Sequence, residues 1–292
     1  MRGMAMEETS EEVTRQGVAT ELGSRVIRWR AVAGGDINQA HEAVLADGRT
    51  VFVKSNPQPP PGMFAKEARG LAWLAEARAL RVPAVLCHGP GFLVLEHITA
   101  VRQQANYDEQ LGRGLAALHA FGAPAFGLDH DNFIGRLPQA NAALPTWAEF
   151  YRTRRLEPQL RLAVQEGRAS AAMRASFTHV LPRLEELVGP PEPPARLHGD
   201  LWGGNAMVDE HGQPCLIDPA VYGGHREVDL AMMRLFGGFG PYVFAAYQEA
   251  FPLAAGHLTR VPLYQLYFLM VHVNLFGGSY VTQAERVLAH LA

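Results

Sequence analysis

The segment from residue 197 to residue 220, LHGDLWGGNAMVDEHGQPCLIDPA, holds the side chains best suited to chemistry. Asp200 ends an HGD triplet, Asn205 follows five residues later, and Asp218 comes after the apolar run PCLI. Phosphoryl transfer needs a carboxylate that accepts or orients a hydroxyl proton, and Asp200 is a candidate for that base. It also needs oxygen ligands for Mg²⁺, a role that suits Asn205 and Asp218. The pattern therefore predicts a phosphoryl-transfer site.

Two other interpretations of this segment remain open. A single Asp in a glycine-rich turn usually forms the turn or caps a helix. A His–Asp metal site of hydrolase type is a further alternative, although no second His pair lies nearby at ligand spacing. The joint pattern favours phosphoryl transfer, because the step from Asp200 to Asn205 is the Asp-to-Asn spacing of a kinase catalytic loop.

The amino-terminal half offers matching residues. Lys54 ends the apolar segment TVFVK, and Glu67 follows thirteen residues later in a predicted helix. In kinase-like folds a strand Lys contacts the α- and β-phosphates and a helix Glu orients it. Lys54 is also one of only two lysines among 26 basic residues. Upstream, Gly34 and Gly35 could form a turn whose amides cover phosphates, although a plain hairpin is an equally good interpretation.

The elements that must position these residues differ along the chain. Residues 28–54 predict three strands, the last two joined by an Asp47-Gly48 hairpin, and residues 92–98 predict a further short strand. Apolar spacing predicts helices over 64–80, 111–121, 147–165, 169–188, 228–251 and 261–276. We therefore expect an α+β fold of two lobes: a nucleotide-binding lobe with a small antiparallel sheet over residues 1–98, and a mostly helical lobe over residues 99–292.

Composition excludes several classes of protein. The chain has 292 residues, 48% of them apolar, and a net charge of −3, which argues against disorder and against broad electrostatic binding to nucleic acid or membranes. Two cysteines favour a reducing compartment, and the acidic start of the chain does not resemble a secretory signal. The apolar run over 261–276 is polar-interrupted and too short for a membrane span. We expect a cytoplasmic protein.

Several segments resemble the fructosamine kinase (ketosamine-3-kinase) family: LHGDLWGGN, DPAVYGGHREVDLAMMRLFGGF, FGLDHDNFIGRLPQAN and LYQLYFLMVHVNLFGG. The resemblance spans residues 31–278 and implies a protein-kinase-like fold shared with aminoglycoside and choline kinases. It implies ATP and Mg²⁺ as cofactors, Asp200 as the base and Asn205 with Asp218 as metal ligands. Lys54 and Glu67 would form the nucleotide pair, and the linker around Glu96 would meet adenine.

For the acceptor, the resemblance implies that Trp202, His272 and Asn274 face the cleft, while Asp229 braces the catalytic loop. Alternatively, Trp202 is a core aromatic, and His272 and Asn274 are satisfied polar groups of a buried helix. Many family members carry a cysteine in the Gly-rich loop that is linked with redox-sensitive dimerisation. This chain has Asp36 there, so we expect no such switch.

The function expected on these grounds is ATP-dependent phosphorylation of the sugar 3-hydroxyl of a ketoamine. The acceptor would be a small ketoamine or a glycated protein side chain, and the reaction would lead to deglycation of the amine. One alternative is a kinase of the same fold that acts on an aminoglycoside, a choline-like compound or another hydroxyl compound. A second is a nucleotide-binding pseudokinase, which the intact set of Lys54, Asp200, Asn205 and Asp218 argues against.

Overall fold

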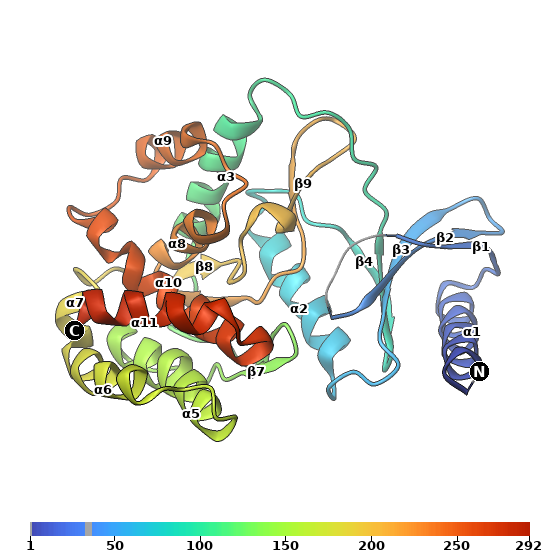
Figure 1. Cartoon of the computed structure of the whole chain (residues 1–292). Coiled ribbons are helices and arrows are strands. Elements are labelled where there is room, and N and C mark those ends of the chain that lie inside the picture. The colour runs from blue at the N-terminus through green and yellow to red at the C-terminus, as the bar shows by residue number, and fades with distance from the viewer. Residues whose placement is uncertain (1, 33–36) are drawn as a thin grey trace.

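The computed structural model describes residues 2–32 and 37–292, and the chain folds into two lobes joined by the segment 97–106 (Figure 1). The smaller lobe has a five-stranded antiparallel sheet with strand order β1-β2-β3-β5-β4. Its elements are α1 (Arg2–Leu22), β1 (Val26–Ala31), β2 (Gln39–Leu45), β3 (Thr50–Ser55), α2 (Met63–Glu76), β4 (Val85–Gly89) and β5 (Phe92–Glu96).

The two faces of this sheet carry different helices. On one face Val18 of α1 packs with Val51 and Val53 of β3, and α1 lies at the outer end of the molecule (Figure 1). On the other face Phe52 of β3 packs against α2, which lies between the sheet and the larger lobe (Figure 1). Because side chains alternate along a strand, Lys54 shares the face of Phe52. The sheet therefore presents Lys54 toward α2 and the second lobe.

The larger lobe is mostly helical and also contains three two-stranded sheets, β6–β7, β8–β11 and β9–β10. In chain order its elements are α3 (Tyr107–Phe121), β6 (Asn132–Ile134), β7 (Leu137–Gln139), α4 (Trp147–Phe150), a π-helical turn (Tyr151–Leu156), α5 (Glu157–Gln165), α6 (Ala171–Val180), a 3₁₀ turn (Leu181–Arg183), α7 (Leu184–Leu187), β8 (Ala195–Leu197), a 3₁₀ turn (Gly203–Asn205), β9 (Ala206–Val208), β10 (Pro214–Leu216), β11 (Tyr222–Gly224), α8 (Glu227–Phe236), α9 (Pro241–Ala250), α10 (His257–Phe276) and α11 (Ser279–Leu291).

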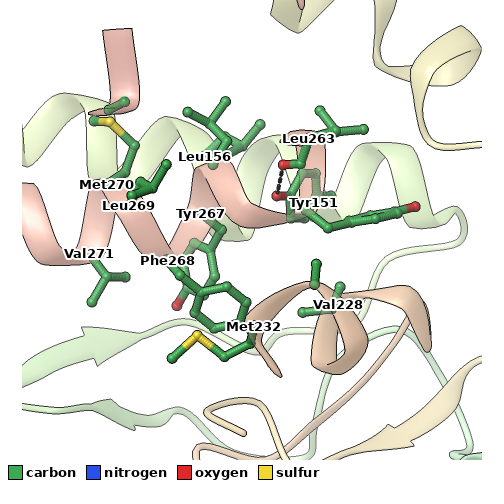
Figure 2. Packing of buried hydrophobic residues seen from close by; sticks show 14 of the residues in the cluster. Tyr151, Leu156, Val228, Met232, Leu263, Tyr267, Phe268, Leu269, Met270 and Val271 are labelled. Atoms are coloured by element: carbon green, nitrogen blue, oxygen red, sulfur yellow. Dashed lines mark hydrogen bonds between the residues drawn. The ribbon is translucent and has the colours of Figure 1, made fainter. Parts of the chain in front are cut away.

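The core of the larger lobe is built around α10, which is buried along most of its length. Figure 2 shows Tyr267 and Phe268 of α10 close to Val228 and Met232 of α8. The hydroxyl of Tyr151 donates a 2.7 Å hydrogen bond to the carbonyl of Leu263 (Figure 2). The prediction that residues 261–276 form a buried helix is confirmed. Of the helices in residues 2–32 and 37–292, none is long and apolar enough to cross a membrane.

The predicted elements hold with some corrections. The three strands over 28–54 and the Asp47-Gly48 turn are confirmed, and Gly48 adopts a φ of +91°. The single helix predicted over 228–251 is wrong: α8 ends at Phe236, just before Gly237 (φ +72°), and α9 starts at Pro241. The helix over 169–188 is broken by a 3₁₀ turn. Helices α1 and α11 and strand β4 were not predicted.

Candidate active site

The catalytic loop begins where β8 ends and turns sharply at Gly199. Gly199 has a φ of +82°, and a Cβ there would collide with the carbonyl oxygen of Ala220. The amide of Ala220 in turn donates to the carbonyl of His198 at 2.9 Å. Only glycine combines this φ with so close an approach. The glycine in the HGD triplet is therefore required by the path of the chain, which brings Asp200 to the cleft.

A buried carboxylate holds this loop from behind. Asp229 of α8 accepts the backbone amides of His198 at 2.8 Å and Gly199 at 2.9 Å, and it also bonds Nε2 of His119 at 3.1 Å. The Nδ1 of His119 lies 2.8 Å from the hydroxyl of Tyr247. Burial alone would raise the pKa of Asp229, but hydrogen bonds from His119 and Gly199 lower it below the usual value. Asp229 therefore stays ionised in the core.

The surroundings of Asp200 shift its pKa in the opposite direction from that of Asp229. Burial, together with repulsion from Asp218 and Asp229, raises the pKa of Asp200 to about 7. The only side-chain donor that it meets among the described residues is Nδ2 of Asn205, 3.5 Å from its Oδ2. A carboxylate of this pKa can accept a proton near neutral pH and release it again. A raised pKa is what the predicted role of Asp200 as the base requires, and that role stays a prediction.

The hairpin of β9 and β10 places the two predicted metal ligands, Asn205 and Asp218, beside Asp200. Asn205 precedes β9, and its Nδ2 donates to the backbone oxygens of Asp200 at 2.8 Å and Asp218 at 3.4 Å. Asp218 follows β10 with a φ of +55°, which is uncommon for a residue other than glycine. His198 adds a bond from Nε2 to the carbonyl of Ile217 at 2.9 Å. The loop and the hairpin thus form one hydrogen-bonded unit.

Lys54 and Glu67 complete the site from the smaller lobe. Nζ of Lys54 lies 2.5 Å from Oε1 of Glu67 on α2, and it also contacts Oδ1 of Asp218. Burial alone would lower the pKa of Lys54, but the two carboxylates raise it. Lys54 is therefore a permanent ammonium that joins the two lobes. The structure brings together five residues predicted from the sequence: Lys54, Glu67, Asp200, Asn205 and Asp218.

The donor set fits a hard divalent cation. The ammonium of Lys54 contacts the carboxylates of Glu67 and Asp218. The carboxylate of Asp218 also repels that of Asp200. Oδ1 of Asn205 and Oδ2 of Asp218 accept no hydrogen bond from the part of the chain that the structure describes. Carboxylate and amide oxygens are the ligands that Mg²⁺ prefers. Among the described residues no cluster of three His, Cys, Asp or Glu side chains could hold a metal by itself.

The remaining predicted residues lie at varied places. Glu96 ends β5 and pairs with Arg81 at 2.7 Å. Trp202 is 41% exposed and its ring covers Gly204, so it is not a core residue. Gly34 and Gly35 lie outside the described residues, and their phosphate role stays a prediction, as does the absence of a redox switch at Asp36.

His272 and Asn274 of α10 are placed differently from each other. The ring of His272 packs at a tilt against the rings of Phe236 (4.6 Å between centroids) and Tyr280 (4.8 Å), and its Nδ1 bonds the carbonyl of Phe268. Asn274 is buried, and its Nδ2 donates to both oxygens of Gln159. These bonds join α10 to α5, and the role of Asn274 toward the acceptor stays a prediction.

Sequence comparison identifies the family to which this arrangement belongs. The model of the family described as fructosamine kinase matches residues 8–292, almost the whole chain. The chain belongs to the fructosamine kinase family. It is 41% identical over 271 residues to the Synechocystis protein named "Probable ketoamine kinase slr1563", with 90% of each chain covered. It is 36% identical over 296 residues to the "Protein-ribulosamine 3-kinase, chloroplastic" of Arabidopsis thaliana, with 98% of this chain and 89% of that one covered.

The solved structures agree with this family assignment. A crystal structure of a fructosamine-3-kinase candidate from Thermobifida fusca superposes with a TM-score of 0.88 at 38% identity, covering 95% of this chain and 97% of that one. The expected fold, a two-lobed kinase-like α+β architecture, is therefore confirmed for this member of the fructosamine kinase family.

Some residues that shape the site were not found from the sequence. His119 and Tyr247 support Asp229 from α3 and α9, which are separated by more than a hundred residues along the chain. Neither residue lies in a motif, because each acts on the loop only through the packing of its helix. A buried His in the otherwise apolar face of α3 is the one weak signal that points to this role.

Proposed function

We propose that this chain transfers the γ-phosphoryl group of ATP to the 3-hydroxyl of the sugar part of a ketoamine. The observation that carries the proposal is the half-buried carboxylate of Asp200, with its raised pKa, beside the open oxygens of Asn205 and Asp218. The family to which the chain belongs, and the ribulosamine 3-kinase among its relatives, support the acceptor class.

The residues of the site divide the work of this reaction. Asp200 accepts the proton of the attacking hydroxyl as the bond to phosphorus forms. The Lys54 ammonium, oriented by Glu67, neutralises charge on the α- and β-phosphates, while the linker after Glu96 binds adenine through its backbone. Asn205 and Asp218 would hold Mg²⁺, which supplies charge neutralisation on the phosphates.

The product explains the use of such an enzyme. Phosphate on carbon 3 becomes allylic when the ketoamine enolises toward its amine-bearing carbon, so phosphate leaves without further catalysis. Water then releases the amine. The reaction would therefore remove a sugar from an amine to which it had become attached.

The acceptor would bind between the catalytic loop and the carboxyl end of α10. Trp202 follows Asp200 by two residues, and its half-exposed indole can hold the protonated amine of a ketoamine with about 0.5–2 kcal/mol. The amide of Gly203 donates to the carbonyl of Gly237 at 3.1 Å, and the neighbouring Phe236 packs on His272. This chain of contacts supports His272 as the second acceptor residue.

A panel of acceptors tests the proposal by ADP release. We expect high kcat/KM for fructose- or ribulose-modified lysine, low values for free fructose and ribulose, and hardly any turnover of kanamycin. Trp202→Ala should narrow the gap between modified lysine and free sugar, whereas Trp202→Phe should retain most of it. Tyr242→Ala, an exposed aromatic on α9, is the matched control and should change nothing. Faster turnover of kanamycin than of either ketoamine would refute the ketoamine assignment.

A further inference from the structure

The β9–β10 hairpin connects two places that lie at opposite ends of the nucleotide site. The two candidate metal ligands lie at its open end: Asn205 just before β9 and Asp218 just after β10. At its closed end is the turn 209–213, which lies against the linker 97–106 between the lobes. Strand pairing over three residues on each side keeps the two ends in fixed register. The hairpin therefore spans from the metal site to the linker.

The turn at the closed end is built to be rigid. Oδ1 of Asp209 accepts the amides of His211 and Gln213, each at 2.9 Å, and the Asp209 amide donates to the carbonyl of Gln213 at 2.8 Å. Asp209 is only 3% exposed, although it belongs to a turn. Such an enclosed carboxylate requires a charged partner.

Arg81, from the loop between α2 and β4 of the smaller lobe, provides that partner and also pairs with a carboxylate of its own lobe. Its NH1 lies 2.8 Å from carboxylate oxygens of both Asp209 and Glu210, and its NH2 lies 2.7 Å from Oε1 of Glu96. Its backbone oxygen accepts the amide of Leu216 in β10 at 2.8 Å. One guanidinium thus joins the strand that leads into the linker to the hairpin that carries the metal ligands.

The linker itself is bonded to the same turn. The backbone amide of Gln104 donates to the carbonyl of Gly212 at 3.1 Å. Its side-chain Nε2 donates to the carbonyl of His211 at 2.7 Å, and its Oε1 accepts from the side-chain Nε2 of Gln213 at 2.9 Å. Arg81 and Gln104 therefore hold two sides of one turn.

We infer that Arg81 is a positioning residue that couples the adenine end of the nucleotide site to its phosphate end, with the β9–β10 hairpin as the rigid connection. The inference rests on the proposed function, because it takes the linker as the adenine site and Asn205 with Asp218 as the metal ligands. A ligand that occupies both ends of a preformed site gains from the fixed separation between them. A ligand that occupies one end gains nothing from it.

Binding of three ligands distinguishes this coupling from a general destabilisation of the fold. Adenosine reports the linker end alone, Mg²⁺ with tripolyphosphate reports the phosphate end alone, and Mg²⁺ with ATP reports both. Their dissociation constants are measured by calorimetry on the full chain without acceptor. In Arg81→Lys, a point charge replaces the fork that spans Glu96, Asp209 and Glu210. We expect the dissociation constant of ATP to rise about tenfold while those of adenosine and tripolyphosphate change less than about twofold.

Two more variants complete the experiment. Gln104→Ala removes the linker's side-chain bonds to the turn and leaves every buried charge in place. It should raise the dissociation constant of ATP less than Arg81→Lys does, again with little change for adenosine and tripolyphosphate. This variant tests the coupling even if Arg81→Lys fails to fold. Arg113→Lys changes an exposed guanidinium that pairs with Glu109 and Glu249 and not with the turn 209–213, and it should leave all three constants unchanged.

The outcomes distinguish this inference from the proposed function. An unchanged ATP constant in Arg81→Lys, or an equal weakening of all three ligands, overturns the coupling. If the wild-type chain binds no ATP, the proposed function fails before Arg81 is tested.

Discussion

The two lobes hold their parts of the site by different means. In the smaller lobe, Lys54 and Glu67 stand on a regular strand and a regular helix, whose backbone groups are satisfied by β2, β5 and the turns of α2. In the larger lobe, Asp200 and Asp218 stand on irregular segments whose amides and carbonyls are bonded by side chains, above all by Asp229. Regular elements therefore position one half of the site, and a buried polar network positions the other.

This difference has a physical reason. A strand or helix presents side chains at fixed intervals, which suffices to join one ammonium to one carboxylate. A base and two metal ligands must converge on one phosphoryl group, which requires turns such as those at Gly199 and Asp218. The backbone groups exposed by these turns must find partners inside the protein. The network around Asp229 supplies those partners, and the larger lobe should therefore be the more sensitive to single polar substitutions.

The largest effect on activity should come from substitution of Asp200, which the polar network of the larger lobe positions. Asp200→Asn keeps the shape of the side chain and removes the base, so we expect kcat to fall about 10²–10⁴-fold. The dissociation constant of ATP should stay near that of the wild type, because Lys54, Glu67 and the linker are untouched. Steady-state kinetics and nucleotide binding on the same preparation measure both. If Asp200→Asn keeps more than half of the wild-type kcat, Asp200 is not the base.

The comparison between the lobes is tested directly by a pair of isosteric substitutions. Asp229→Asn removes the charge that receives two amides and His119 in the core, and we expect the free energy of unfolding to fall by about 3 kcal/mol. Glu67→Gln removes one of the two carboxylates bonded to Lys54, which keeps Asp218 as a charged partner and the amide oxygen of the new side chain as an acceptor, so we expect a smaller loss of about 1 kcal/mol together with weaker ATP binding. Urea unfolding of both variants measures the two losses of stability, and calorimetry measures ATP binding by Glu67→Gln. Equal losses of stability in the two variants would contradict the difference between the lobes.

The same difference explains what could be predicted from the sequence. Lys54, Glu67, Asp200, Asn205 and Asp218 follow from spacing along short segments, and the structure brings them together as expected. The strands of residues 28–54 follow from alternation and from the Asp47-Gly48 turn. Local patterns of this kind are visible in a sequence because the residues concerned lie within one or two elements.

The rest depends on contacts between distant segments. His119 reaches Asp229 across 110 residues of sequence, and Arg81 reaches Asp209 across 128. No spacing rule connects such pairs, since only the packed fold brings them together. The break between α8 and α9 was missed for a related reason. Gly237 interrupts an otherwise helical pattern, and Gly238 packs closely against Gly203 of the catalytic loop, a contact that helix propensity does not encode.

A third effect concerns pH and stability. Burial and the neighbouring carboxylates raise the pKa of Asp200 to about 7, from an ordinary value of 3.8. Between these two values the folded chain holds a proton that the unfolded chain releases, so the contribution of Asp200 to stability falls as pH rises through this window. Asn does not titrate. We therefore expect the stability of Asp200→Asn relative to the wild type to increase by about 2 kcal/mol between pH 5 and pH 8.

This measurement is made by urea unfolding of the metal-free chain in the presence of a chelator. Glu149→Gln, which changes a solvent-facing carboxylate on α4, is the control and should show no such pH dependence. A relative stability of Asp200→Asn that stays constant from pH 5 to pH 8 would mean that Asp200 is ionised throughout. The surroundings of Asp200 would then favour the ionised carboxylate, as those of Asp229 do.

The smallest effect should separate the two candidate metal ligands, of which Asp218 also contacts Lys54 of the smaller lobe. Asp218→Asn keeps a side chain that tolerates the left-handed backbone and removes a charge that would neutralise Mg²⁺. We expect the Mg²⁺ concentration for half-maximal activity to rise about tenfold. Asn205→Asp adds a charge to the opposite ligand but loses the Nδ2 bonds to Asp200 and Asp218, so kcat should fall without a rise in the Mg²⁺ requirement. Activity titrated with Mg²⁺ at saturating ATP gives both values. An unchanged Mg²⁺ requirement in Asp218→Asn would assign to Asp218 only the bond to Lys54, and the metal would then depend on other oxygens of the site.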